Sequence, residues 1–188
     1  EPENPIALAM LASMHTHMIP LIPFSELPDD FDNALALSER AVEVGQNIDY
    51  VLRTRANLRL WRLVDHDGAR LDCKRAFEIN PGYHLAHLTM ATSEIFSGEF
   101  QAGEKRLQGI MQRVPDDPQN PLYFSLIALA RLLDGRMNHA VAAAREGYDL
   151  SPLSDWNALV YATTVGAEPA PRTEAFNSMV ASIKLSAN

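Results

Sequence analysis

Prolines and small residues recur along this chain at nearly regular intervals. The prolines that follow expected helices are 34 and then 37 residues apart, at Pro81, Pro115 and Pro152. Small residues keep the same register, with steps of 35, 34 and 37 residues, at Ala34, Ala69, Gly103 and Ala140. Both 37-residue steps cross residues 116–120, so one short insertion accounts for them. A repeat of this length confines the fold to a stack of similar supersecondary units.

Between these markers the apolar residues follow a helical period. They recur at steps of three and four, most clearly within residues 52–63 and 122–133. No segment sustains an alternation of β-branched or aromatic residues with polar ones, so strands are not expected. The pattern predicts helices over residues 5–19, 30–45, 50–64, 68–79, 83–97, 100–113, 121–134, 138–149, 154–166 and 172–185.

Several residues agree in register when units begin near Tyr50, His84 and Pro121. Small residues recur at two positions of the unit. One position holds Ala91 and Ala128, and the other holds Ala69, Gly103 and Ala140. Glycine recurs between the two helices, at Gly98 and Gly135. Trp156 and Leu159 then begin a further half unit. This pattern resembles the tetratricopeptide repeat (TPR), whose unit is a pair of antiparallel helices that pack closely through small residues.

The resemblance implies an all-α fold, a right-handed superhelix (α-solenoid) of TPR-like antiparallel helix pairs. It divides a single domain over residues 1–188 into a divergent N-terminal unit at about 1–49, repeats at 50–83, 84–120 and 121–152, and a half repeat with a capping helix at 153–188. Asn57 departs from the family pattern, which has Gly or Ala there. The proline-rich stretch from Pro20 to Pro28 also departs from it.

Charge and cysteine content narrow the expected partners and compartment. The 188 residues include 16 Lys and Arg against 24 Asp and Glu, which gives a formal net charge of −8. Proteins that wrap nucleic acid or anionic lipid are normally basic, so we expect this fragment to bind neither nucleic acid nor a membrane. The single cysteine, Cys73, excludes an intrachain disulfide and fits a cytoplasmic location.

Two further features concern the ends and the apolar runs of the chain. The chain begins at Glu1 rather than Met, so we expect a fragment or a processed product. Its apolar runs are interrupted well short of the ~20 residues that a membrane-spanning helix needs. No transmembrane helix is therefore expected.

The sequence contains no recognisable catalytic or cofactor-binding motif. There is no Gly-x-Ser-x-Gly elbow and no glycine-rich phosphate loop, so we expect neither enzymatic activity nor a cofactor. Cys73 lies mid-helix and is expected to be a buried structural thiol. His84 and His87 share a helix face, but a metal site is not expected without a third ligand. Asp67 is expected to cap the helix that follows it.

Two opposite charges occupy the same position in successive units. Glu94 and Arg131 both fall on the first helix of a unit, at the eleventh position. Because first helices stack side by side in this family, we expect an inter-repeat ion pair between them. The alternative is that both side chains contact a ligand.

In TPR proteins the first helices line a concave face that binds peptides. The resemblance places the following residues on that face as a partner-binding surface: Thr54, Leu58, Trp61, Arg62, Leu88, Thr92, Ile95, Phe96, Ser125 and Leu129. The lining is mainly apolar, which suits a hydrophobic peptide or a second copy of the chain. The alternative is that neighbouring helices fill much of this lining.

These features favour a protein–protein interaction or oligomerisation module. By resemblance, it would be the regulatory or sensory part of a larger bacterial protein, such as a multidomain transcriptional regulator or nucleotide cyclase. The alternative is a small-molecule or metal-binding sensor that uses His84, His87, Glu94 and Arg131. A helical enzyme would need clustered titratable groups that the sequence does not indicate.

Overall fold

The computed structural model of this chain describes residues 3–14 and 30–166, and these form helices and short turns. The helices are α1 (Pro5–Met14), α2 (Asp30–Val44), α3 (Asp49–Leu58) with its π-helical continuation η3 (Arg59–Leu63), α4 (His66–Ile79), α5 (His84–Phe96), α6 (Phe100–Arg113), α7 (Asn120–Leu133), α8 (Met137–Leu150) and α9 (Asp155–Val165). No strand occurs in these two ranges.

The predicted all-α class and nearly all helix boundaries are confirmed, with ends that differ by two residues or fewer. The first expected helix is observed up to Met14, and its predicted continuation to residue 19 lies outside the described residues. The stretch Pro20–Pro28, His15, His17 and the expected helix over residues 172–185 lie outside them too.

The chain divides into two compact units, Glu1–Ser93 and Glu94–Asn188, so the boundary falls within α5. That residues 1–188 act as one domain with the repeat boundaries given above stays a prediction. None of the helices within residues 3–14 and 30–166 combines the length and the hydropathy that a membrane span requires.

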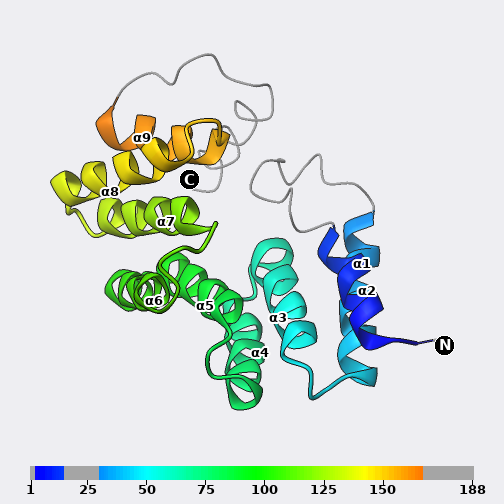
Figure 1. Ribbon diagram of the computed structural model, residues 1–188. Coiled ribbons are helices and arrows are strands. Elements are labelled where there is room, and N and C mark those ends of the chain that lie inside the picture. Colours follow the sequence, from blue (N-terminus) through cyan, green and yellow to red (C-terminus); the bar gives the residue numbers. More distant parts are fainter. Residues whose placement is uncertain (1–2, 15–29, 167–188) are drawn as a thin grey trace. The chain divides into compact units, whose positions relative to one another are not determined.

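In the first unit, α1 packs against α2 and α3, and α3 packs against α4 (Figure 1). Alanines lie at the centres of these contacts because their small side chains let helix backbones approach closely. The main cluster contains Ala9, Ala41, Val42, Val51, Leu52, Ala76 and Ala86. A second cluster joins α3, η3, α4 and α5 through Ala56, Leu60, Ala69, Cys73 and Met90, so the predicted burial of Cys73 is confirmed.

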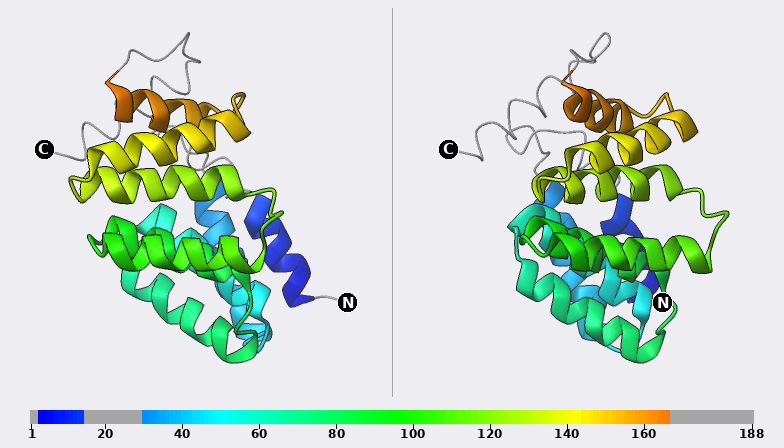
Figure 2. Two further views of the ribbon diagram at one scale, coloured as in Figure 1. Left: turned by 60° about the vertical axis from the view of Figure 1, so that its left-hand side comes forward. Right: turned by 90° about the vertical axis from the view of Figure 1, so that its left-hand side faces the viewer.

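In the second unit, α7 packs against α6, α8 and α9, and successive helices of the α7–α9 stack run in opposite directions (Figure 2). Helices α7 and α8 approach closely at Gly147 of α8, where an added Cβ would lie 2.9 Å from the Pro121 carbonyl oxygen. Buried Asn157 of α9 completes the contact, because its Nδ2 donates to the Gly147 carbonyl oxygen at 3.2 Å and its Oδ1 accepts from Ser125 Oγ at 2.7 Å.

Two of the turns between paired helices share one backbone conformation. Gly98 and Gly135 have φ values of 86° and 75°, in the left-handed region that favours glycine. At each turn the following residue closes a Schellman motif: Glu99 N–H donates to Glu94 O and Arg136 N–H donates to Arg131 O, both at 2.8 Å. The predicted turn glycines are therefore confirmed.

Val64 is the exception among these turns. It precedes Gly98 by 34 residues and so holds the same repeat position, with a φ of 53°. The helix before it widens into η3, and the closing bond spans one residue more, from Asp65 N–H to Arg59 O at 3.0 Å. A β-branched residue is poorly suited to this conformation, so the turn at Val64 carries backbone strain that the two glycine turns lack.

Candidate functional site

The predicted partner-binding face is largely buried. Six of its ten residues are buried: Thr54, Leu58, Leu88, Thr92, Ile95 and Ser125. Trp61 and Leu129 are half-buried, and Phe96 is 39% exposed. Arg62 lies in η3, and its side chain is outside the description.

The polar members of that face bond within the protein. Thr54 Oγ1 donates to the Tyr50 carbonyl oxygen, and Thr92 Oγ1 donates to the Leu88 carbonyl oxygen, each at 2.9 Å. Ser125 Oγ donates to Asn157, as described above. These side chains are therefore buried with partners inside the protein, and Phe96 is the most accessible of the described residues in the predicted set. The role of the set as a partner-binding surface stays a prediction.

The expected ion pair between Glu94 and Arg131 is wrong. Glu94 instead accepts two hydrogen bonds from Arg106 of α6, at 2.9 and 2.6 Å. Arg131 pairs with Glu104, also of α6, at 2.7 Å. Glu104 and Arg106 are two positions apart on one helix and so point to opposite sides of it. The prediction considered only the first helices of the repeats, so it missed Glu104 and Arg106, which lie on a second helix.

Glu104 also forms an ion pair with a second arginine, Arg136. Its Oε2 accepts a bond of 2.7 Å from Arg136 Nη2, and its side chain is only 10% exposed. Burial raises the pKa of the Glu104 carboxyl, but the hydrogen bonds from Arg136 and Arg131 outweigh burial and hold the pKa below its ordinary value of 4.5. The group is therefore an ionised carboxylate at neutral pH that joins α6, α7 and the turn before α8.

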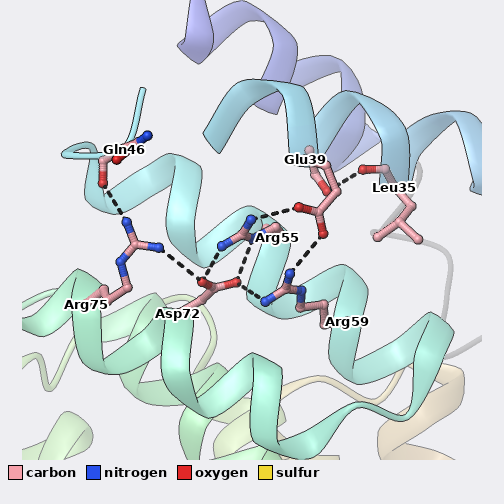
Figure 3. A network of polar contacts seen from close by, with 8 residues as sticks. Leu35, Glu39, Gln46, Arg55, Arg59, Asp72 and Arg75 are labelled. Carbon is pink, nitrogen blue, oxygen red and sulfur yellow. Dashed lines mark hydrogen bonds and ion pairs between the residues drawn. The ribbon is translucent and has the colours of Figure 1, made fainter. Parts of the chain in front are cut away.

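A larger charged network lies between α2, α3, η3 and α4 (Figure 3). At its centre is Asp72, whose side chain is 0% exposed. Its Oδ2 accepts bonds from Arg55 Nε at 2.8 Å and from Arg59 Nη1 at 3.1 Å. The same two arginines also bond to Glu39 of α2, at 2.7 and 3.0 Å, and Arg75 lies 3.9 Å from Asp72.

The network is suited to holding helices together. Burial lowers the pKa of Arg55, but the hydrogen bonds and charges of Asp72 and Glu39 outweigh burial and raise that pKa above its ordinary value. A guanidinium that stays protonated does not exchange protons with a substrate near neutral pH, so the network offers no general acid or base through Arg55. The sequence analysis did not identify this network. The sequence feature that could have indicated the network is the spacing of four between Arg55 and Arg59, which places both arginines on one helix face.

The histidines proposed for an alternative sensor site have local contacts. His87 stacks on Phe77, with ring centroids 4.2 Å apart, and its Nε2 lies 2.8 Å from the Pro81 carbonyl oxygen. His84 meets Tyr83 edge-on. In the described part of the chain, no group of three or more His, Cys, Asp or Glu side chains is arranged to hold a metal ion.

The predicted cap at Asp67 is wrong. Helix α4 begins at His66, two residues before the expected start, so Asp65 is the residue at its N-terminus. The Asp65 Oδ1 accepts a hydrogen bond of 2.8 Å from Gly68 N–H. Asp67 lies within the first turn instead, where a carboxylate is still favourable to the helix dipole.

Solved structures resemble this fold at low sequence identity. A tetratricopeptide repeat protein from Parabacteroides merdae matches with a TM-score of 0.66 and 16% identity, covering 100% of this chain and 75% of that one. MamA from Desulfovibrio magneticus matches with a TM-score of 0.58 and 13% identity, covering 96% of this chain and 98% of that one. No protein-family model and no curated protein matches the sequence. The chain therefore has a TPR-like fold of antiparallel helix pairs.

Proposed function

We propose that this chain is a protein-interaction module. The observation that carries the proposal is that the charged side chains between helices bond to one another. Asp72 and Glu104, the buried carboxylates at the two network centres, each accept hydrogen bonds from two arginines and so connect neighbouring helices. Large apolar side chains, in contrast, remain at the surface of both units. A helix-pair scaffold with structural charges and apolar surface side chains is suited to binding other proteins.

Finer features of the proposal rest on the resemblance to TPR proteins. The partner is a protein or peptide. Within the predicted face, the described side chains that are at least partly exposed for binding it are Trp61, Phe96 and Leu129. The module would form the regulatory or sensory part of a larger bacterial protein, act in the cytoplasm and bind no nucleic acid. Self-association is the other form of interaction that the resemblance suggests.

Selection of binding peptides tests the proposal directly. The purified 188-residue chain is immobilised and a displayed library of helical peptides is selected against it, with heat-unfolded chain as the counter-selection. We expect peptides with an apolar stripe to be enriched and to bind the folded chain saturably. A lack of enrichment over the unfolded chain, together with a monomer at every concentration in light scattering, would contradict the proposal.

A further inference from the structure

Helix α3 continues into η3, a π-helical segment that holds one residue more than the corresponding turn of the next repeat. Its closing bond runs from Asp65 N–H to Arg59 O at 3.0 Å and spans six residues. The equivalent bond of the next repeat runs from Glu99 N–H to Glu94 O and spans five. Single π-helical turns are rare and are frequent at functional sites. A specific interaction is therefore needed to hold η3 in this form.

The charged pairs beside the two turns differ by the same single residue. In the α5–α6 pair, Glu94 accepts two hydrogen bonds from Arg106 of the second helix. In the α3–α4 pair, the position of Arg106 is held by Asp72, 34 residues earlier. The first-helix partner of Asp72 is Arg59, whereas the residue 34 positions before Glu94 is Leu60. The first-helix partner is thus displaced by one residue, which is the number that η3 adds.

Both ends of this stretch are fixed. Arg59 Nη1 donates to Asp72 Oδ2 at 3.1 Å, and its Nη2 donates to Glu39 Oε1 at 3.0 Å (Figure 3). At the other end, Asp65 caps the start of α4. The second helix begins alike in both pairs, since seven residues separate its N-cap from its charged residue. The extra residue must therefore be accommodated between Arg59 and Asp65, in η3.

We infer that the Arg59–Asp72 pair holds η3 in its π-helical form. Without the pair, α3 would continue as a regular helix and Asp65 N–H would donate to Leu60 O, as in the next repeat. That change of one residue turns the side chains of η3 by about 100° around the helix axis relative to α3. One of these side chains is Trp61, which packs against two apolar clusters and belongs to the predicted partner-binding face. The pair therefore sets the orientation of Trp61.

The consequence for binding rests on the proposed function. A partner that fits only one orientation of Trp61 would bind the chain with the pair intact and the chain without it to different extents. The conformation of η3 can be measured without any partner. Failure of the inference is therefore distinguishable from failure of the proposed function.

The test identifies the carbonyl that accepts the Asp65 N–H bond. Scalar couplings across hydrogen bonds, measured by NMR on the isotope-labelled 188-residue chain, connect an amide directly to its acceptor. We expect the acceptor to be the carbonyl of residue 59 in the unchanged chain and that of Leu60 in the variant Arg59→Met. This variant should fold, because Asp72 keeps its two bonds from Arg55.

Two control variants separate the pair from other causes of η3. Arg55→Met removes more hydrogen bonds from Asp72 than Arg59→Met does, but it lies before η3 and should leave the acceptor at residue 59. Val64→Gly removes the valine from the left-handed turn and should also leave the acceptor unchanged, because the pair is intact. The indole N–H resonance of Trp61 should shift more in Arg59→Met than in either control.

Two results would overturn the inference. An acceptor at residue 59 in folded Arg59→Met would mean that apolar packing holds η3. An acceptor at Leu60 in Val64→Gly would mean that the valine holds it, and this result is decisive even if Arg59→Met does not fold. If both expectations are met and no peptide is enriched from the displayed library, the pair still explains η3 and only the proposed function fails.

Discussion

Arg55 and Asp72 are joined by two parallel hydrogen bonds, from Nε to Oδ2 at 2.8 Å and from Nη2 to Oδ1 at 2.6 Å. The pair connects α3 to α4, and its carboxylate is fully buried. A two-point arrangement between a planar guanidinium and a carboxylate restricts direction as well as distance. It therefore fixes how α4 is rotated against α3, in addition to holding the helices together.

Removing one partner of this pair should be strongly destabilising. We expect Asp72→Ala to lower the free energy of unfolding by about 3–5 kcal/mol, because Arg55 is left buried without its main counter-charge. Urea denaturation followed by circular dichroism measures the change. The double variant Arg55→Met with Asp72→Leu should lose less than Asp72→Ala alone, since it leaves no buried charge from this pair. A loss under 1 kcal/mol for Asp72→Ala would contradict the structural role.

The strained turn at Val64 predicts a stabilising substitution. We expect Val64→Gly to raise the free energy of unfolding by about 0.5–1 kcal/mol, because relief of the left-handed strain exceeds the added entropy of the unfolded chain. Gly135→Ala is the matched test of opposite sign and should cost about 1 kcal/mol. An added Cβ at Gly135 meets no atom within 4 Å, so only backbone conformation is changed there. Thermal unfolding of both variants gives the comparison, and destabilisation by Val64→Gly would refute the strain.

Two helical glycines should respond oppositely to alanine. In Gly147→Ala, the new Cβ would lie 2.9 Å from Pro121 O and 3.0 Å from Ser125 Oγ, so α7 and α8 must separate. We expect a loss of about 1–3 kcal/mol. In Gly109→Ala, the nearest atom is the end of the flexible Arg113 side chain at 3.7 Å, and higher helix propensity should stabilise by up to about 1 kcal/mol. Chemical denaturation measures the change in the free energy of unfolding for each variant. If both variants gain stability, or both lose it, the close packing at Gly147 is contradicted.

The Glu104 carboxylate predicts a specific dependence on acid pH. Because its pKa in the folded state lies below 4.5, its ionised form adds stability that is fully present above that value. The contribution is lost as the pH falls through the lower, folded-state pKa. We expect Glu104→Gln to show a smaller loss of stability between neutral and acid pH than the unchanged chain. The double variant Arg131→Gln with Arg136→Gln should flatten the profile similarly, and an unaltered acid profile in both would contradict the assignment.

Local patterns predicted the helices accurately. Helix periodicity depends on neighbours three and four positions away, and the turns depend on single residues such as Gly98 and Gly135. These signals can be read without knowing which helices touch. The exception at α4 has the same local origin, since Asp65 and Asp67 are both able to cap and only the observed backbone distinguishes them.

The candidate site was less accessible to prediction. The family register placed Thr54, Ile95 and Ser125 on first helices, but it could not show that neighbouring side chains bury them. The exposed apolar residues Ile6, Met10 and Met14 of α1 were also missed, because α1 contains no charged residue and its sequence does not distinguish the side that packs from the side that remains exposed.

The sequence by itself determined the all-α class, the repeat length and the positions of helices and turns, because these follow from interactions between residues close together in the chain. Only the tertiary structure decided which charges meet. Glu94 bonds to Arg106 and Arg131 bonds to Glu104, because these two side chains of α6 lie within hydrogen-bond distance of them. An ion pair depends on helix rotation and on separations of a few ångströms, and a repeat pattern specifies neither.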